Sequence, residues 1–174
     1  WFRPEWYYWQ FAIVALGFLV KSFIHWERDG QKRHIFNPSS FPLAVFSLVL
    51  ILTGTTDHTF GLEIAQSLFN PPLIYLAVFL VTLPAQILFG VATMTIASVI
   101  TAYSWSLLYF GVTGTFFFRD AYIPIAVFLG MHLLFTDPAT SPKSEQGRVI
   151  FGVLYASFTI ALAGILEGLG APAF

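Results

Sequence analysis

The sequence has no cysteine and few charged residues. Without cysteine the chain forms no disulfide, offers no thiolate to an iron–sulfur cluster and has no cysteine nucleophile. Only 10% of its 174 residues are charged, against about 25% in a typical soluble domain. The formal net charge of −1 argues against nucleic acid as a partner. Walker and Rossmann phosphate loops are also absent, and no spacing favours a Ser-His-Asp triad.

Apolar residues take the place of charge. The chain is 57% hydrophobic and 18% aromatic, with a mean hydropathy of +0.76. Such a chain cannot cover itself with polar surface in water, so we predict an all-α membrane protein in the lipid bilayer. The pattern predicts about six transmembrane helices, some short or discontinuous, in a single domain over 1–174. The expected helices span residues 6–26, 38–55, 72–89, 92–111, 122–136 and 148–166.

The longest stretch without charge runs from residue 73 to residue 112 and is too long for one helix. We expect a break near Gly90, and a kink at Pro84. The helix after the break carries hydroxyl residues three positions apart, at Thr95, Ser98 and Thr101, which places them on one face. Small hydroxyl residues let membrane helices pack closely, and the lining of a pathway is the alternative.

The basic residues indicate an orientation. If six helices alternate, the loops 26–40 and 136–148 lie on the same side of the membrane. Arg3 and Arg119 fall on the other side. By the positive-inside rule the more basic side is cytoplasmic, so we expect a multi-pass membrane protein with the loops 26–40 and 136–148 in the cytoplasm. The basic side carries Lys21, Arg28, Lys32, Arg33, Lys143 and Arg148.

Two similar motifs stand in these two basic loops, at 36–40 (Phe-Asn-Pro-Ser-Ser) and 136–141 (Thr-Asp-Pro-Ala-Thr-Ser). An Asn-Pro or Asp-Pro step favours a capped helix start, so we expect one helix to begin at each motif. Short apolar segments at matching places in two halves indicate a binding site between discontinuous helices, in an inverted-repeat arrangement. Helix N-termini could there hold an anion or a carbonyl-rich ring. The alternative is that each motif only caps its own helix.

His132 lies within an expected helix, where ionisable residues are functional by default. Haem ligation or proton relay would be its functional roles. It has no histidine partner within a span, so we favour a hydrogen-bonded structural histidine.

The motifs resemble those of a known family. Residues 33–41 and 134–142, with Gly147-Arg148 and Phe151-Gly152 behind them, resemble the RnfD/NqrB family. These are membrane subunits of bacterial ion-pumping, flavin-containing electron-transport complexes. Residues 123–132 look closer still to the RnfD-like proteins called UnbU in enediyne biosynthesis clusters. The resemblance covers about residues 30–172 and implies two inverted repeats with more helices than six. We therefore expect the chain, which begins at Trp1, to be part of a longer protein.

The resemblance implies a location in the bacterial inner membrane and a flavin or quinone near the paired motifs. Its electron-transport members attach FMN to a threonine in a Ser-Gly-Ala-Thr-like motif, which this sequence lacks. We therefore expect no covalent FMN; non-covalent FMN or riboflavin, a quinone, or no cofactor are the alternatives. The candidate cofactor-binding residues are Arg33, Asn37, Pro38, Ser39, Ser40, Asp137, Pro138, Thr140, Ser141 and Arg148.

Each candidate has an expected role. Asn37 and Asp137 would orient the ring or cap the half-helices. Ser39 and Thr140 would donate hydrogen bonds. The guanidinium groups of Arg33 and Arg148 would neutralise a phosphate or a reduced flavin.

The expected function is thus that of a redox subunit, with other membrane subunits as partners and with no catalytic triad or metal site. Two alternatives stay open. One is a transporter for a small neutral or anionic solute, on the same inverted-repeat reasoning. The other is an accessory structural subunit of a larger assembly, whose 20 Phe, 7 Tyr and 5 Trp would pack on protein, pigment or lipid.

Overall fold

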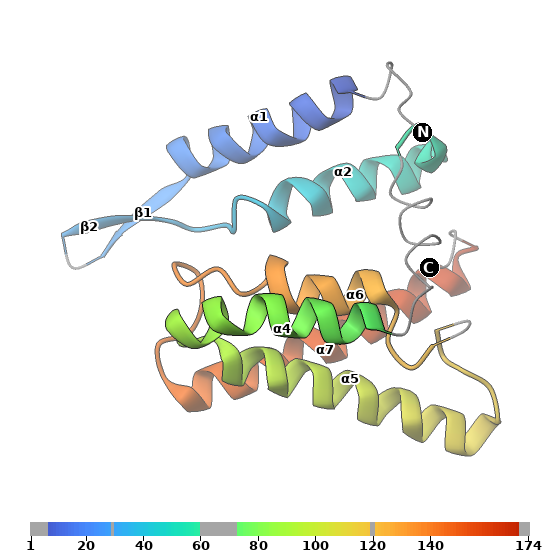
Figure 1. Cartoon of the computed structure of the whole chain (residues 1–174). Coiled ribbons are helices and arrows are strands. Elements are labelled where there is room, and N and C mark those ends of the chain that lie inside the picture. Colours follow the sequence, from blue (N-terminus) through green and yellow to red (C-terminus); the bar gives the residue numbers. More distant parts are fainter. Residues whose placement is uncertain (1–6, 29, 60–72, 119–120, 171–174) are drawn as a thin grey trace. The chain divides into compact units, whose positions relative to one another are not determined.

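The computed structural model describes residues 7–28, 30–59, 73–118 and 121–170, and these are mostly helical. They belong to two compact units, Trp1–Glu63 and Ile64–Phe174, and each unit is described by itself. The first holds α1 (Tyr7–Phe23), β1 (His25–Arg28), β2 (Gln31–His34), α2 (Ser40–Thr53) and the 3-10 helix η2 (Thr56–His58). The second holds α4 (Leu73–Leu88), α5 (Ala92–Thr113), α6 (Ile125–Leu129), the π-helix η3 (Gly130–Leu134) and α7 (Glu145–Gly168) (Figure 1).

In the first unit α1 and α2 run in opposite directions and are joined by a β-hairpin (Figure 1). The expected helix over 6–26 ends earlier, at Phe23, and the loop expected over 26–40 begins as two paired strands. The pairing is antiparallel, with His25 opposite His34. An Asp-Gly step between alternating side chains favours a tight hairpin turn, and Gly30 has the positive φ, 72°, that such a turn needs. The chain therefore turns in a hairpin after Phe23, and α1 does not extend to residue 26 as expected.

Gly17 sets how closely α1 approaches the start of α2. A Cβ added at Gly17 would lie 2.6 Å from the carbonyl oxygen of Pro38. At the far end of α2, Gly54 adopts a left-handed conformation, and its N–H donates to the Ile51 carbonyl at 3.2 Å. This is a common way to end a helix. The 14 residues of α2 make it short, as expected from the sequence.

In the second unit the break expected near Gly90 is confirmed. Helix α4 ends at Leu88 and α5 begins at Ala92, with Gly90 between them at φ 68°. Pro84 lies inside α4, and the helix continues through it; the kink expected at Pro84 stays a prediction. Helices α5 and α7 run in the same direction, and α4 runs opposite to them (Figure 1).

Small residues bring α5 and α7 together. A Cβ added at Gly152 would lie 2.4 Å from the carbonyl oxygen of Met94 and 3.1 Å from the backbone nitrogen of Ser98. Ser98 and Ala156 are fully buried, and Thr95 on the hydroxyl-rich face is 2% exposed. The geometry at Ser98 therefore supports the close-packing interpretation of this face.

The chain between α5 and α7 contains a short, irregular helix. The helix expected over 122–136 begins later, at Ile125, because Pro124 is extended at ψ 144°. It changes to a π-helix at Gly130 and ends at Leu134. The last helix, expected over 148–166, is α7.

Helices α5 and α7 are long and apolar enough to cross a membrane, by length and composition alone. The shorter apolar helices have 10–17 residues. The number of spans, six, stays a prediction, as do the single domain and the side assigned to each loop. Arg119 and residues 6 and 72 lie outside the described residues.

Candidate functional site

The 36–40 motif forms a helix start, as predicted, but helix α2 runs over Ser40–Thr53 and not over the expected 38–55. The Asn37 Oδ1 accepts the backbone N–H groups of Ser39 at 2.9 Å and Ser40 at 3.1 Å, and the Ser39 hydroxyl at 2.6 Å. Helix α2 begins at Ser40, immediately after this turn. The Asn37 side chain therefore satisfies backbone donors that the first turn of a helix leaves without partners.

The 136–141 motif forms a turn, and the helix start expected at Asp137 is wrong. The Asp137 Oδ1 accepts the N–H of Ala139 at 3.2 Å, and Oδ2 accepts the Thr140 hydroxyl at 3.1 Å. Its backbone carbonyl accepts both the N–H and the hydroxyl of Ser141, at 3.0 and 2.7 Å. Pro142 lacks an N–H and disfavours helix at the residue before it, so the turn goes no further.

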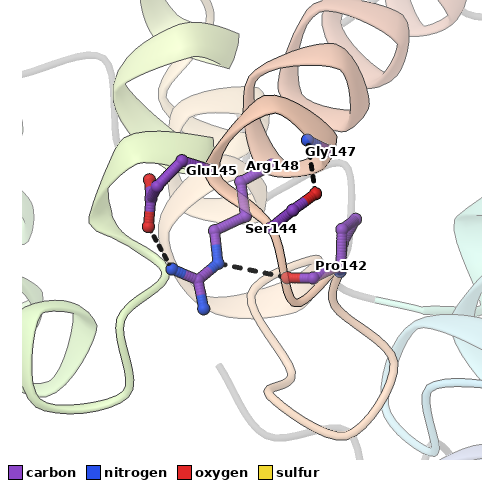
Figure 2. Close-up of polar contacts among 5 residues, drawn as sticks. All are labelled: Pro142, Ser144, Glu145, Gly147 and Arg148. Carbon is purple, nitrogen blue, oxygen red and sulfur yellow. Dashed lines mark hydrogen bonds and ion pairs between the residues drawn. The ribbon is translucent and has the colours of Figure 1, made fainter.

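The helix starts instead at Glu145, with Ser144 as its cap. The Ser144 backbone is extended, and its Oγ accepts the N–H of Gly147 at 3.1 Å (Figure 2). A Cβ at Gly147 would lie 2.9 Å from both Ser144 Oγ and Pro142 Cβ, so glycine fits this tight entry.

The two motifs thus share their local chemistry but differ in outcome. In each, an Asn or Asp side chain bonds the backbone and a hydroxyl of the residues that follow it. One turn opens a helix and the other does not. They belong to different units, so a ligand shared between them stays a prediction.

Arg33 and Arg148 have different surroundings. Arg33 lies in β2, and its Nη2 donates to the Gln31 Oε1 at 3.3 Å on the exposed hairpin. The Arg148 side chain is 19% exposed, its Nε donates to the Pro142 carbonyl at 3.1 Å, and its Nη1 pairs with Glu145 (Figure 2). Arg148 thus holds the loop before α7.

Arg148 also connects α7 to the turn between α4 and α5. A Cβ at Gly90 would lie 3.4 Å from its Nη1 and Nη2. The turn at Gly90 and the start of α7 therefore lie at the same end of the second unit. Alternating helices predict this arrangement.

Glu145 stands before the uncharged stretch 149–166, at the polar end of α7. The Thr93 hydroxyl and the Arg148 guanidinium beside it lower the pKa of the Glu145 carboxyl, although partial desolvation acts the other way. Both groups favour the ionised form, since each interacts more strongly with a carboxylate than with a carboxylic acid.

Four polar residues inside the second unit form a connected group, made of the side chains of Thr82, Gln86 and Thr136 and the backbone carbonyl of His132. The Gln86 Nε2 donates to the Thr82 Oγ1 at 3.2 Å and to the His132 carbonyl at 3.1 Å. The Thr136 hydroxyl donates to the same carbonyl at 3.0 Å. Three of the four are at most 7% exposed, and Thr136 is half-buried.

The π-helix ends two residues after His132, so the His132 carbonyl accepts side-chain donors in place of a further helical turn. The N–H of Phe135 reaches back five residues, to the Gly130 carbonyl at 3.3 Å, and the helix ends there. Gln86 of α4 and Thr136 supply the His132 carbonyl with side-chain donors. π-Helical turns are frequent at functional sites, but here the surrounding bonds have a structural role.

The His132 ring is also hydrogen-bonded. Its Nδ1 lies 2.7 Å from the Phe128 carbonyl, which only accepts, so Nδ1 carries a hydrogen. The ring packs against Phe128 with centroids 4.1 Å apart. This geometry agrees with the interpretation of His132 as a structural histidine. Gln86 was not among the predicted residues. Its position four residues after Thr82, in a stretch without charge, indicates that both side chains lie on one face of a helix.

A cavity of about 410 Å³ in the first unit adjoins the 36–40 motif. Pro38 and Ser39 contribute to its wall, and Lys21 is its charged residue. The rest of the wall is apolar and comes from α1 and α2: Ile13, Val14, Gly17, Phe18 and Leu43. Among the described residues, no group of three His, Asp or Glu could hold a metal ion.

Comparisons with family models, with curated proteins and with solved structures found no match to this chain.

Proposed function

We propose that this chain is a membrane-embedded, RnfD-like subunit of a bacterial electron-transport complex in the inner membrane. In this proposal the subunit binds a flavin or a quinone non-covalently, beside the 36–40 motif. The cavity at Pro38 and Ser39 is the observation that carries the proposal, because it places space for a ligand at residues that the resemblance selects.

The exposed apolar side chains support a location in the membrane. Along α7, Phe158 is 69% exposed and Ile165 is 60% exposed. Exposed apolar faces of this extent are costly in water and are satisfied by lipid or by a partner subunit. The absence of charge from 149 to 166 fits the thickness of a bilayer core, about 30 Å.

The wall of the cavity suits a flat ring with a negative group at one end. Its volume lies within the range of about 300–1,000 Å³ that is usual for small-molecule sites. Phe18 and Leu43 offer apolar surface for a ring. Lys21, which the sequence reasoning did not include among the site residues, would neutralise a phosphate or a reduced ring.

Retention of a native cofactor tests this proposal. The protein would be expressed in a bacterial membrane, extracted in mild detergent and assayed for flavin absorbance and extractable quinone. We expect a cofactor in the unaltered protein, less of it in Lys21→Gln, and full retention in Lys32→Gln, whose exposed hairpin position lies outside the cavity. A protein that carries neither flavin nor quinone would contradict the proposal.

The orientation can be tested directly because the chain has no cysteine to remove. Lys32→Cys in the β-hairpin and His58→Cys in η2 each introduce one exposed thiol. In intact cells an impermeant maleimide should label the variant at 58 and spare the variant at 32. The reverse pattern, or labelling of both, would overturn the expected topology.

A second candidate function is that of an accessory structural subunit. It is favoured by the hydrogen bonds within each motif, in which the side-chain oxygens of Asn37 and Asp137 accept backbone N–H groups of the chain itself. Such a subunit would purify in a stoichiometric complex with other membrane proteins and carry no cofactor, whereas the first candidate carries one.

A further inference from the structure

The β-hairpin of the first unit has one face that changes from apolar to polar along its length. The Ile35 N–H donates to the Ile24 carbonyl at 3.3 Å, which continues the pairing of β1 and β2 toward the helices. Since successive side chains of a strand point to opposite faces, every second pair shares a face. We call this the Trp26–Arg33 face, and its described side chains are those of Ile24, Trp26, Gln31, Arg33 and Ile35. The bond from the Arg33 Nη2 to the Gln31 Oε1 agrees with this assignment.

The Trp26–Arg33 face is ordered by polarity from the helices to the turn. Its two isoleucines come first, between the strands and the helices, and both are exposed. Trp26 and Arg33 stand opposite each other at the next pair, and Gln31 lies nearest the turn. The opposite face has no such order, because it begins beside the helices with two polar side chains, His25 and His34.

The two faces also differ in charge. On the opposite face Glu27 lies directly across from Lys32, so a carboxylate offsets the charge of the lysine. Arg33 lies across from Trp26, and its Nη2 donates to the neutral amide of Gln31. None of the described side chains on the Trp26–Arg33 face is acidic. The guanidinium of Arg33 therefore keeps a positive charge that no carboxylate on its own face offsets.

The order along this face matches the depth of a lipid headgroup layer. The hairpin extends beyond the ends of α1 and α2 (Figure 1). A strand rises about 3.4 Å per residue, so Trp26 lies about 7 Å further from α1 than Ile24 does. The headgroup layer on each side of a bilayer core is about 5–7 Å thick. With the isoleucines at the edge of the core, Trp26 and Arg33 lie among the headgroups, where tryptophan is enriched in membrane proteins.

We propose that the Trp26–Arg33 face binds the headgroup of an anionic phospholipid. The planar guanidinium of Arg33 can donate two N–H bonds to the oxygen atoms of a phosphate. The indole of Trp26 has an apolar body and a polar N–H, which suits the boundary between acyl chains and headgroups. The inference rests on the membrane location in the proposed function. It does not rest on a cofactor, because none of the five residues of this face lines the cavity at the 36–40 motif.

Quenching of Trp26 fluorescence by brominated lipids measures this binding at the site itself. The full chain, with phenylalanine in place of Trp1, Trp6, Trp9 and Trp105, is reconstituted in phosphatidylcholine vesicles. Circular dichroism checks that its helices are retained. Brominated phosphatidylglycerol, which is anionic, is compared with brominated phosphatidylcholine as the quencher. We expect phosphatidylglycerol to be preferred about fivefold at low salt, the value of one basic group at a membrane surface. The preference should fall as salt is added.

Variants at two neighbouring positions assign the preference to this face. Arg33→Gln should remove most of the preference, because it removes the charge. Arg33→Lys keeps the charge but not the planar pair of donors, so it should give an intermediate preference. Lys32→Gln is the matched control, since Lys32 is the adjacent residue of β2, carries the same charge and lies on the opposite face across from Glu27. It should leave the preference nearly unchanged.

Several results would overturn the proposal. Equal losses in Arg33→Gln and Lys32→Gln would show a general electrostatic attraction, and equal quenching by the two lipids would show no selection at all. Loss of the preference on adding inorganic phosphate at constant ionic strength would indicate a site for soluble anions. A chain that alkaline carbonate strips from membranes would refute the membrane location together with this inference. A chain that stays in the membrane but shows no preference would refute this inference alone.

Discussion

Gly152→Ala should loosen the contact between α5 and α7. The added Cβ would lie 2.4 Å from the Met94 carbonyl oxygen, 3.0 Å from Ala97 Cβ and 3.1 Å from the Ser98 nitrogen. Real Cβ atoms essentially never approach another atom within 3.0 Å, so something must shift, and two of these three neighbours are backbone atoms. The helices must therefore move apart.

The expected magnitude follows from two opposing effects. Overpacking a close contact costs about 1–3 kcal/mol. Replacing glycine by alanine inside a helix contributes up to about 1 kcal/mol in favour of folding. Subtracting the gain in propensity from the cost of the clash, we expect the free energy of unfolding of Gly152→Ala to fall by up to about 2 kcal/mol.

Gly164→Ala on the same helix is the control for propensity. Among the described residues, its Cβ would meet only the Phe117 ring, at 3.7 Å, which is an ordinary van der Waals contact. Both variants gain the same helix propensity, so the difference between them isolates the clash, about 1–3 kcal/mol. Reversible unfolding in mixed detergent micelles, followed by circular dichroism, measures both free energies.

The result that would refute this reasoning is equal stability of the two variants. A stabilised Gly152→Ala would have the same meaning, because propensity would then exceed the clash. Either outcome would show that α5 and α7 do not approach each other as closely at Gly152 as described.

Three further predictions concern single side chains. Asn37→Ala should lower the free energy of unfolding by about 0.5–2 kcal/mol, because two backbone N–H groups lose their acceptor; Asn37→Asp keeps the acceptor and should match the unaltered protein in the same unfolding assay. Gln86→Leu should cost about 0.6 and at most about 1.7 kcal/mol, through loss of one donor to the His132 carbonyl; an unchanged stability would argue against this bond. The lowered pKa of Glu145 means that its stabilising effect is present above the usual carboxyl pKa and is lost as the pH falls through the lowered value. Glu145→Gln should therefore flatten the acid side of a stability–pH profile, and an unaltered profile would count against this.

Much of the helical arrangement could be read from the sequence because lipid-compatible helices depend on local properties. The uncharged stretch 73–112 had to break, and Gly90 was the residue suited to do so. The hairpin at 25–34 was missed because polar residues with an Asp-Gly step predict a loop and a tight turn equally well.

The candidate site was predictable only in part. The cap at Asn37 depends on neighbours in sequence, so it was foreseen. The prediction of a helix start at Asp137 was wrong. Pro142, four residues beyond Pro138, ends the turn before a helix can form. The sequence did not predict that Lys21 lines the cavity, because Lys21 lies on α1 and the motif lies at the start of α2.

The sequence by itself determined the apolar, mostly helical character of the chain and the place of most helix ends, since these follow from composition, from proline and glycine, and from capping side chains within a few positions. The tertiary structure alone decided which side chains meet across elements. Gln86 reaches the His132 carbonyl 46 positions away, and Gly152 lies against Met94. Such contacts depend on how whole helices pack, and no local pattern specifies that packing.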